Sequence, residues 1–177
     1  MTTSRTAKNP ARQNLTRKTS KKRRPRTHKF PVDNALMLLD ASRNSMLDPQ
    51  QLFAMLPMRV YHDIGDIGAG PGYFTIPLAK YAFDGHVYAI DMQQGMLDIV
   101  AARLDKARLN NAEIILSKET KIPMDQGALD RAIIVNTLHE ATRPKTLLQE
   151  TLRLLRKGGW VGLIDWRRIE SEEGPPI

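Results

Sequence analysis

The sequence contains no cysteine among its 177 residues. Disulfide bonds, thiolate zinc sites and cysteine nucleophiles are therefore excluded, and a cytoplasmic location is compatible with this composition. No apolar run approaches the roughly 20 residues that a membrane-spanning helix needs, so we expect a soluble chain. With 41% hydrophobic residues, the chain is long enough for one domain with a core and too short for two ordinary domains.

Acidic residues are absent from the first thirty positions. This segment holds eleven of the 27 Lys and Arg residues, which leaves sixteen basic residues against 19 acidic ones in the remainder. The net charge of +8 is therefore a property of the tail. A segment rich in Ser, Thr, Asn and basic residues cannot bury enough apolar surface to fold alone. We predict a disordered basic tail over residues 1–30 and a single domain over residues 31–177.

The basic run at residues 21–26 allows several functions for the tail. It could bind nucleic acid, bind an anionic membrane surface, or act as a nuclear address. Its composition also permits an organellar transit peptide, although the amphipathic spacing is poor. A solubilising extension without a further role carries equal weight, so the tail does not decide the function.

Strand and helix patterns alternate along the domain. The predicted strands cover residues 60–66, 86–91, 112–116, 130–135 and 160–166. The predicted helices cover residues 33–45, 49–56, 73–83, 93–109 and 143–156. We expect Asp48 to cap the second of these helices, because Pro49 suits a first helical position. The alternation predicts a doubly wound, mostly parallel Rossmann-like α/β sheet with helices on both faces.

A glycine-rich loop follows the first predicted strand, where residues 66–72 read Asp-Ile-Gly-Ala-Gly-Pro-Gly. Gly68, Gly70 and Gly72 can adopt backbone angles closed to other residues and let the main chain approach a ligand. Asp91 ends the second predicted strand, nineteen residues after Gly72. A carboxylate at that spacing typically binds ribose hydroxyls, so the pattern predicts an adenosine-containing cofactor.

Two observations favour S-adenosylmethionine (SAM) over NAD as this cofactor. The dinucleotide fingerprint G-x-G-x-x-G requires glycine at position 73, where the chain has Tyr73. The chain also has no Tyr-x-x-x-Lys pair, a common hydride-transfer arrangement in short-chain dehydrogenases. An NAD-dependent oxidoreductase therefore stays as the less favoured alternative.

Four segments, in order and in register, resemble the class I SAM-dependent methyltransferases. These segments are residues 66–74, 87–91, 129–136 and 154–160. The resemblance covers residues 60–166 and implies methyl transfer from SAM to an acceptor. The Asn/Asp-Pro-Pro-Tyr motif of amide and adenine methylation is absent, and cytosine-C5 methylation requires the missing cysteine. A small molecule, as in quinone methyltransferases, is therefore the favoured acceptor, and no metal site is predicted.

The resemblance implies roles for residues of the predicted cofactor site. The positions that would face the methionine portion of SAM are Asp66, Gly68, Ala69, Gly70 and Gly72. Asp91 would bind the ribose hydroxyls, and Met92 would lie against the adenine. The family usually has an acid after the third strand for the adenine amino group, and Glu119 is the nearest match. Asn136 would border the cofactor at the end of the fourth strand.

His139 and Glu140 are the candidate catalytic residues. They are the adjacent acid-base pair in the loop that would border the methyl acceptor. Alignment supplies most of the acceleration of such a displacement, so a base is optional. The alternative is that Glu140 lies in the first turn of a helix, where it would favour the dipole, and that His139 is only a loop residue.

Related enzymes complete the sheet with two further strands, yet only eleven residues follow Trp166. We therefore expect the last two strands to be missing and the domain to be incomplete at its C-terminal end. A partner chain could cover the exposed sheet edge. A further alternative is a non-catalytic SAM-fold module that binds nucleic acid through the basic tail.

Overall fold

The computed structural model describes residues 29–167. The predicted basic tail falls outside this part except for Lys29 and Phe30, and so do residues 168–177. None of the helices within residues 29–167 combines the length and apolar character that a membrane span requires.

Five parallel strands form one sheet in the order β3-β2-β1-β4-β5. They are β1 (Asp63–Ile67), β2 (His86–Asp91), β3 (Ala112–Leu116), β4 (Leu129–Val135) and β5 (Leu155–Ile164). The strand order reverses between β1 and β4, which are direct neighbours. Ligands bind to such sheets at the carboxyl ends of the strands next to this switch point. The predicted doubly wound parallel sheet is confirmed.

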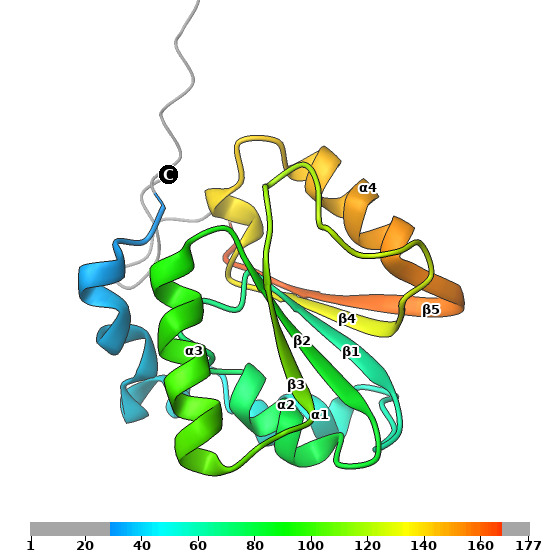
Figure 1. Cartoon of the computed structure of the whole chain (residues 1–177). Helices are drawn as coiled ribbons and strands as arrows, with labels where there is room; N and C mark the ends of the chain where they lie inside the picture. The colour runs from blue at the N-terminus through cyan, green and yellow to red at the C-terminus, as the bar shows by residue number, and fades with distance from the viewer. Residues whose placement is uncertain (1–28, 168–177) are drawn as a thin grey trace, which may run out of the picture.

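Helices cover both faces of the sheet (Figure 1). The helices are α1 (Pro49–Met55), α2 (Thr75–Tyr81), α3 (Gln94–Ala107) and α4 (Pro144–Leu154). Residues of α1, α2 and α3 pack with Ile64, Val87 and Ile133 in one hydrophobic cluster, whereas α4 packs with Ile90 and Ile134 in a second. The two clusters follow the alternation of side chains along the strands.

Two strands begin several residues away from their predicted first residues. β1 begins at Asp63 because residues 59–62 form a turn, in which His62 Nδ1 accepts a hydrogen bond from Arg59 N at 3.0 Å. β5 begins at Leu155 and runs through Gly158 and Gly159, which lie between the helix predicted to end at residue 156 and the strand predicted to begin at residue 160. The register of the β4–β5 pair shifts between Leu129 and Arg131, so β5 bulges there. A Cβ on Gly159 would lie 2.8 Å from Asp130 O, so only glycine fits this bulge.

The first predicted helix is also different in the structure. Residues 33–45 form two short 3-10 helices, η1 (Val32–Leu39) and η2 (Ala41–Ser45). Asp40 lies between them in an extended conformation, and its carboxylate accepts a hydrogen bond from Ser42 N at 2.8 Å. The predicted cap at Asp48 is confirmed, because its side chain accepts from Gln50 N at 2.7 Å.

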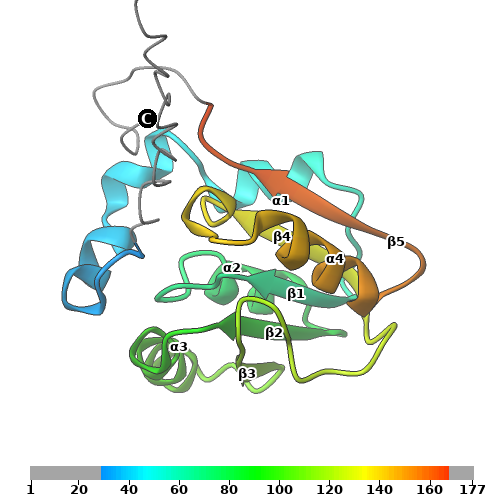
Figure 2. The same ribbon diagram turned by 90° about the horizontal axis from the view of Figure 1, so that it is seen from above.

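Residues 29–47, which we call the N-terminal strap, lie beyond the carboxyl ends of the strands (Figure 2). Leu38 is 3.9 Å from the position that a Cβ on Gly70 would occupy. Tyr73 Oη donates a hydrogen bond to Leu47 O at 3.2 Å, and the Arg43 guanidinium lies 5.2 Å from the Tyr73 ring centroid. The strap therefore packs against the glycine-rich loop.

Candidate active site

The glycine-rich loop joins β1 to α2 at the switch point of the sheet. Gly68, Gly70 and Gly72 all adopt left-handed backbone angles, with φ of 76°, 52° and 81°. A Cβ on Gly68 would lie 2.3 Å from Thr137 Cγ2, so this glycine permits contact with the loop that follows β4. A Cβ on Gly70 would meet nothing closer than the 3.9 Å contact with Leu38. Gly70 therefore leaves space above the loop, whereas the missing side chain of Gly68 lets the loop pack against Thr137, which follows β4.

Asp91 connects the end of β2 to this loop. Its Oδ2 accepts a hydrogen bond from Gly70 N, and its Oδ1 accepts one from Gln93 N, both at 2.9 Å. Burial raises the pKa of Asp91, while these main-chain donors oppose that rise. Each carboxylate oxygen can accept a second hydrogen bond, so Asp91 can still bind hydroxyl donors.

Asp66 lies on β1 and is buried on the face covered by α2. Its Oδ2 accepts a hydrogen bond from Thr75 Oγ1 at 2.6 Å. Burial raises the pKa of Asp66 to about 7, helped by the charge of Asp91 and opposed by the Thr75 hydrogen bond. The sequence prediction missed Thr75, although its place in the first turn of α2, above a strand-ending acid, could have indicated it.

This set of groups fits the chemistry of SAM. Asp91 offers acceptors to a ribose diol, and Asp66 is a buried acid that a cationic ligand would stabilise as a carboxylate. The space over Gly70 allows close approach of a ligand to the main chain. The residues that would hold SAM are thus Asp66, Asp91 and the loop between them in space.

The structure also places three other residues that were predicted to border the cofactor. Met92 is partly buried beside Asp91. Asn136 has a φ of 50°, and its main-chain N donates to Ile164 O at 2.9 Å, so it turns the chain at the end of β4. Glu119 accepts hydrogen bonds from Thr142 Oγ1 and Arg143 N just before α4. Glu119 thus anchors the N-terminus of α4, and its role at adenine stays a prediction.

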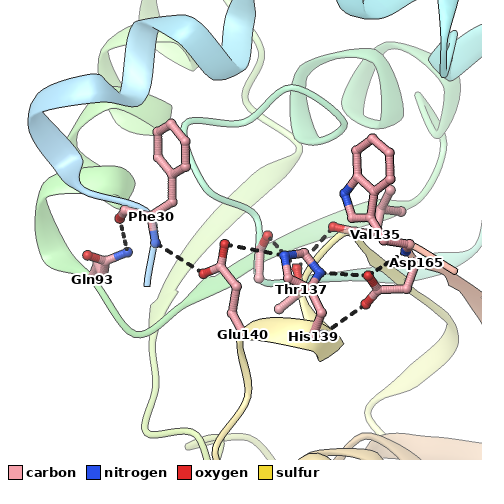
Figure 3. Close-up of polar contacts among 9 residues, drawn as sticks. Phe30, Gln93, Val135, Thr137, His139, Glu140 and Asp165 are labelled. Carbon is pink, nitrogen blue, oxygen red and sulfur yellow. Dashed lines mark hydrogen bonds and ion pairs between the residues drawn. The ribbon is translucent and has the colours of Figure 1, made fainter. Parts of the chain in front are cut away.

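His139 and Glu140 lie in η3 (Leu138–Glu140), which follows β4. His139 Nδ1 is 2.6 Å from Asp165 Oδ1, and His139 N donates to Asp165 Oδ2 at 3.1 Å. His139 Nε2 lies 3.8 Å from Glu140 Oε1 (Figure 3). The prediction missed Asp165, although an acid just beyond the end of β5 lies where the carboxyl ends of parallel strands meet. Glu140 lies in the single turn of η3 and precedes α4, which begins at Pro144.

Glu140 also binds the N-terminal strap. Its Oε2 accepts a hydrogen bond from Phe30 N at 3.2 Å, and Gln93 Nε2 donates to Phe30 O at the same distance (Figure 3). Burial raises the pKa of Glu140, whereas the Phe30 hydrogen bond and the His139 charge act in the opposite direction. Polar contacts thus run from Asp165 through His139 and Glu140 to the strap.

A family described as "Methyltransferase domain" matches residues 64–159, more than half of the chain. The chain belongs to the class I SAM-dependent methyltransferase family. The matched region includes both carboxylates of the cofactor site and both candidate catalytic residues. It leaves out Phe30 and Asp165.

Individual methyltransferases are similar to this chain in sequence and structure. A crystal structure of a SAM-dependent methyltransferase from Aquifex aeolicus aligns with a TM-score of 0.79 and 31% identity, covering 84% of this chain and 79% of that one. An uncharacterised methyltransferase of Mycobacterium tuberculosis is 31% identical over 62% of this chain and 41% of its own length. The demethylmenaquinone methyltransferase of Clavibacter sepedonicus is 32% identical over 57% and 40%, respectively. The chain spans about two fifths of the length of these two curated relatives.

Proposed function

We propose that this chain transfers a methyl group from SAM to a small molecule. The observation that carries the proposal is the contact between Asp91 and Gly70 at the switch point of the sheet. It brings a carboxylate suited to ribose hydroxyls against a loop that is open above Gly70. The family membership and the fit of Asp66 to a cationic ligand support the same donor.

The residues divide into two functional groups. Asp91 would bind the ribose hydroxyls, and Asp66 with the glycine-rich loop would hold the methionine portion. When bound, SAM supplies a methyl group on a sulfonium, and transfer to a hydroxyl leaves a neutral thioether and one proton to be removed. His139 Nε2 would accept that proton, and the nearby Glu140 carboxylate would stabilise the imidazolium that results.

A hydroxylated small molecule is the proposed acceptor. The 32% identity to a demethylmenaquinone methyltransferase supports a quinol as the first compound to test. His139 suits such a substrate, because methylation of a quinol, on a hydroxyl oxygen or on a ring carbon, releases one proton.

Calorimetry on the full chain tests the proposal with SAM, S-adenosylhomocysteine (SAH) and NAD. We expect SAM and SAH to bind and NAD not to bind. Asp91→Ala should abolish binding by removing the ribose acceptor, and Gly70→Val should do so because a β-branched residue is strained at a φ of 52°. Unchanged affinity in both folded variants would refute the site assignment.

The basic tail is tested separately, by deletion of residues 1–28. Cofactor binding should survive this deletion. If the chain is instead a nucleic-acid-binding module, its affinity for RNA or DNA should fall steeply with salt and vanish in the deleted form.

A further inference from the structure

Cofactor binding does not explain why Asp165 lies in this site. It follows β5 and faces η3, where its carboxylate has three donors around it. Oδ1 lies 2.6 Å from His139 Nδ1 and accepts from Trp166 N at 2.7 Å, while Oδ2 accepts from His139 N. The Asp165 carboxylate thus contacts both the ring and the main chain of His139.

This arrangement fixes where the imidazole carries its proton. A carboxylate has no hydrogen to donate, so the hydrogen in the 2.6 Å contact must lie on His139 Nδ1. In the neutral ring, Nε2 is then the lone-pair atom. Within residues 29–167, Nε2 has no hydrogen bond, and the nearest opposite charge is Glu140 Oε1 at 3.8 Å. Nε2 is therefore available to accept a proton.

The position of this nitrogen is also constrained by the cofactor side of the site. Thr137, two residues before His139, contacts Gly68, with Oγ1 donating to Gly68 O at 3.4 Å. Its side chain would also clash with any Cβ on Gly68. The segment that carries His139 is therefore held against the glycine-rich loop at one end and against Asp165 at the other.

We propose that Asp165 is a positioning residue that holds His139 in the Nδ1–H tautomer, so that Nε2 can deprotonate the methyl acceptor. This inference rests on the proposed function and restricts it to acceptors that release a proton, such as phenols and quinols. Asp165 itself touches neither reactant. It acts by orienting the ring and by stabilising the imidazolium that forms on proton transfer.

The tautomer can be measured without knowledge of the acceptor, by two-bond ¹H–¹⁵N NMR of the histidine rings in the full chain. The chain has 4 histidines, and His139→Gln assigns the signal of interest. His62 is an internal reference, because its Nδ1 accepts from Arg59 N and its neutral ring must carry hydrogen on Nε2. We expect opposite tautomers for His139 and His62.

Asp165→Asn is the decisive variant. An amide offers one acceptor oxygen where the carboxylate offers two, so its NH₂ group must face either the ring or the main-chain N of His139. Its NH₂ group facing Nδ1 would drive the ring toward the Nε2–H form. Asp98→Asn, an exposed change on α3 with the same loss of charge, is the matched control and should leave the His139 tautomer unchanged.

The outcomes separate this inference from the proposed function. An Nδ1–H form in the wild type that shifts in Asp165→Asn, while SAH affinity stays the same, supports the positioning role. An Nε2–H form in the wild type would overturn it, and so would an equal shift of tautomer in the Asp98→Asn control. If Asp165→Asn does not fold, the wild-type tautomer still decides. Failure of SAH to bind would refute the proposed function without changing the tautomer result.

A kinetic measurement follows once the acceptor screen yields turnover. Asp165→Asn should lower kcat by about a hundredfold and leave KM for SAM unchanged, because the base is lost but the cofactor site is not. A rise in KM for SAM at constant kcat would instead indicate that Asp165 only supports the cofactor site, and would contradict the inference.

Discussion

The two sides of the carboxyl edge of the sheet are assembled in different ways. On the cofactor side, Asp91 bonds to Gly70, and the two are 21 residues apart in the chain. On the reaction side, Glu140 bonds to Phe30 across 110 residues. The cofactor side is built within one strand-loop-helix-strand unit, whereas the reaction side needs segments that meet only when the whole sheet has formed.

The family match includes residues of both sides but not all of their contacts. It covers residues 64–159, which include the cofactor side, but neither the N-terminal strap nor Asp165. The residues proposed to bind the cofactor all lie within the matched region. His139 and Glu140 lie inside the matched region, whereas their partners Asp165 and Phe30 lie outside it.

Gly68 lies where the two sides meet, and its substitution should have the largest effect. Gly68→Ala combines a left-handed residue, at a φ of 76°, with a methyl group 2.3 Å from Thr137 Cγ2. We expect the free energy of unfolding to fall by about 2 to 5 kcal/mol in urea titrations. Gly70→Ala is the matched control, since it meets no close atom and should lose only about 1 to 2 kcal/mol. Equal losses of unfolding free energy in the two variants would show that the close packing of Gly68 against Thr137 does not stabilise the fold.

Asp66→Asn tests whether the buried carboxyl group of Asp66 lowers the stability of the fold while it favours binding of the cofactor. The carboxyl group of the unfolded chain releases its proton near the ordinary aspartate pKa of 3.8, but the folded one does so only at about 7. Between these values the folded state binds more protons, so the free energy of unfolding falls as pH rises, by about 1.4 kcal/mol per pH unit. Above pH 7 the loss is complete.

The amide variant lacks this penalty. We expect Asp66→Asn to be more stable than the wild type by about 2 to 4 kcal/mol at pH 8, and to bind SAM more weakly. Urea unfolding at pH 5 and pH 8 measures the stability, and calorimetry measures the binding. Asp98→Asn, on the exposed face of α3, should keep the wild-type pH dependence. If Asp66→Asn kept the wild-type pH dependence of the free energy of unfolding, the raised pKa of Asp66 would be contradicted.

Glu140 variants test the long-range contact of the reaction side. Glu140→Ala removes the acceptor for Phe30 N, so the Phe30 amide should exchange its hydrogen about fivefold faster, as expected for roughly 1 kcal/mol. Glu140→Gln keeps an acceptor oxygen and should preserve the slow exchange. Hydrogen-exchange NMR gives both rates. Fast exchange in the wild type would show that Glu140 does not hold the strap.

The smallest effect is expected at the other end of the strap. Arg43→Ala removes the cation–π contact with Tyr73, at 5.2 Å from the ring centroid. A loss of about 0.5 kcal/mol, or about 2 °C in Tm, should result. Arg43→Lys retains the charge and should lose less. A drop as large as that of Gly68→Ala would mean that the strap stabilises the whole domain.

Local pattern predicted most of the sheet and part of the site. β2 and β3 have the predicted boundaries: β2 ends at Asp91, and Ser117 follows the last residue of β3. β5 begins five residues before its predicted first residue, since Gly158 and Gly159 indicate a stop when read locally. Only the neighbouring β4 makes them part of a bulge, where Gly159 fits against Asp130 O.

The sequence by itself determined the cofactor motif, because the glycines, Asp66 and Asp91 lie in one contiguous unit whose spacing places them at the ends of adjacent strands. Tertiary structure decided the surroundings of His139. Its contact with Asp165 depends on β5 lying beside β4, and the contact of Glu140 with Phe30 depends on how the strap crosses the edge. Neither arrangement follows from local spacing, because packing of the whole sheet brings these distant segments together.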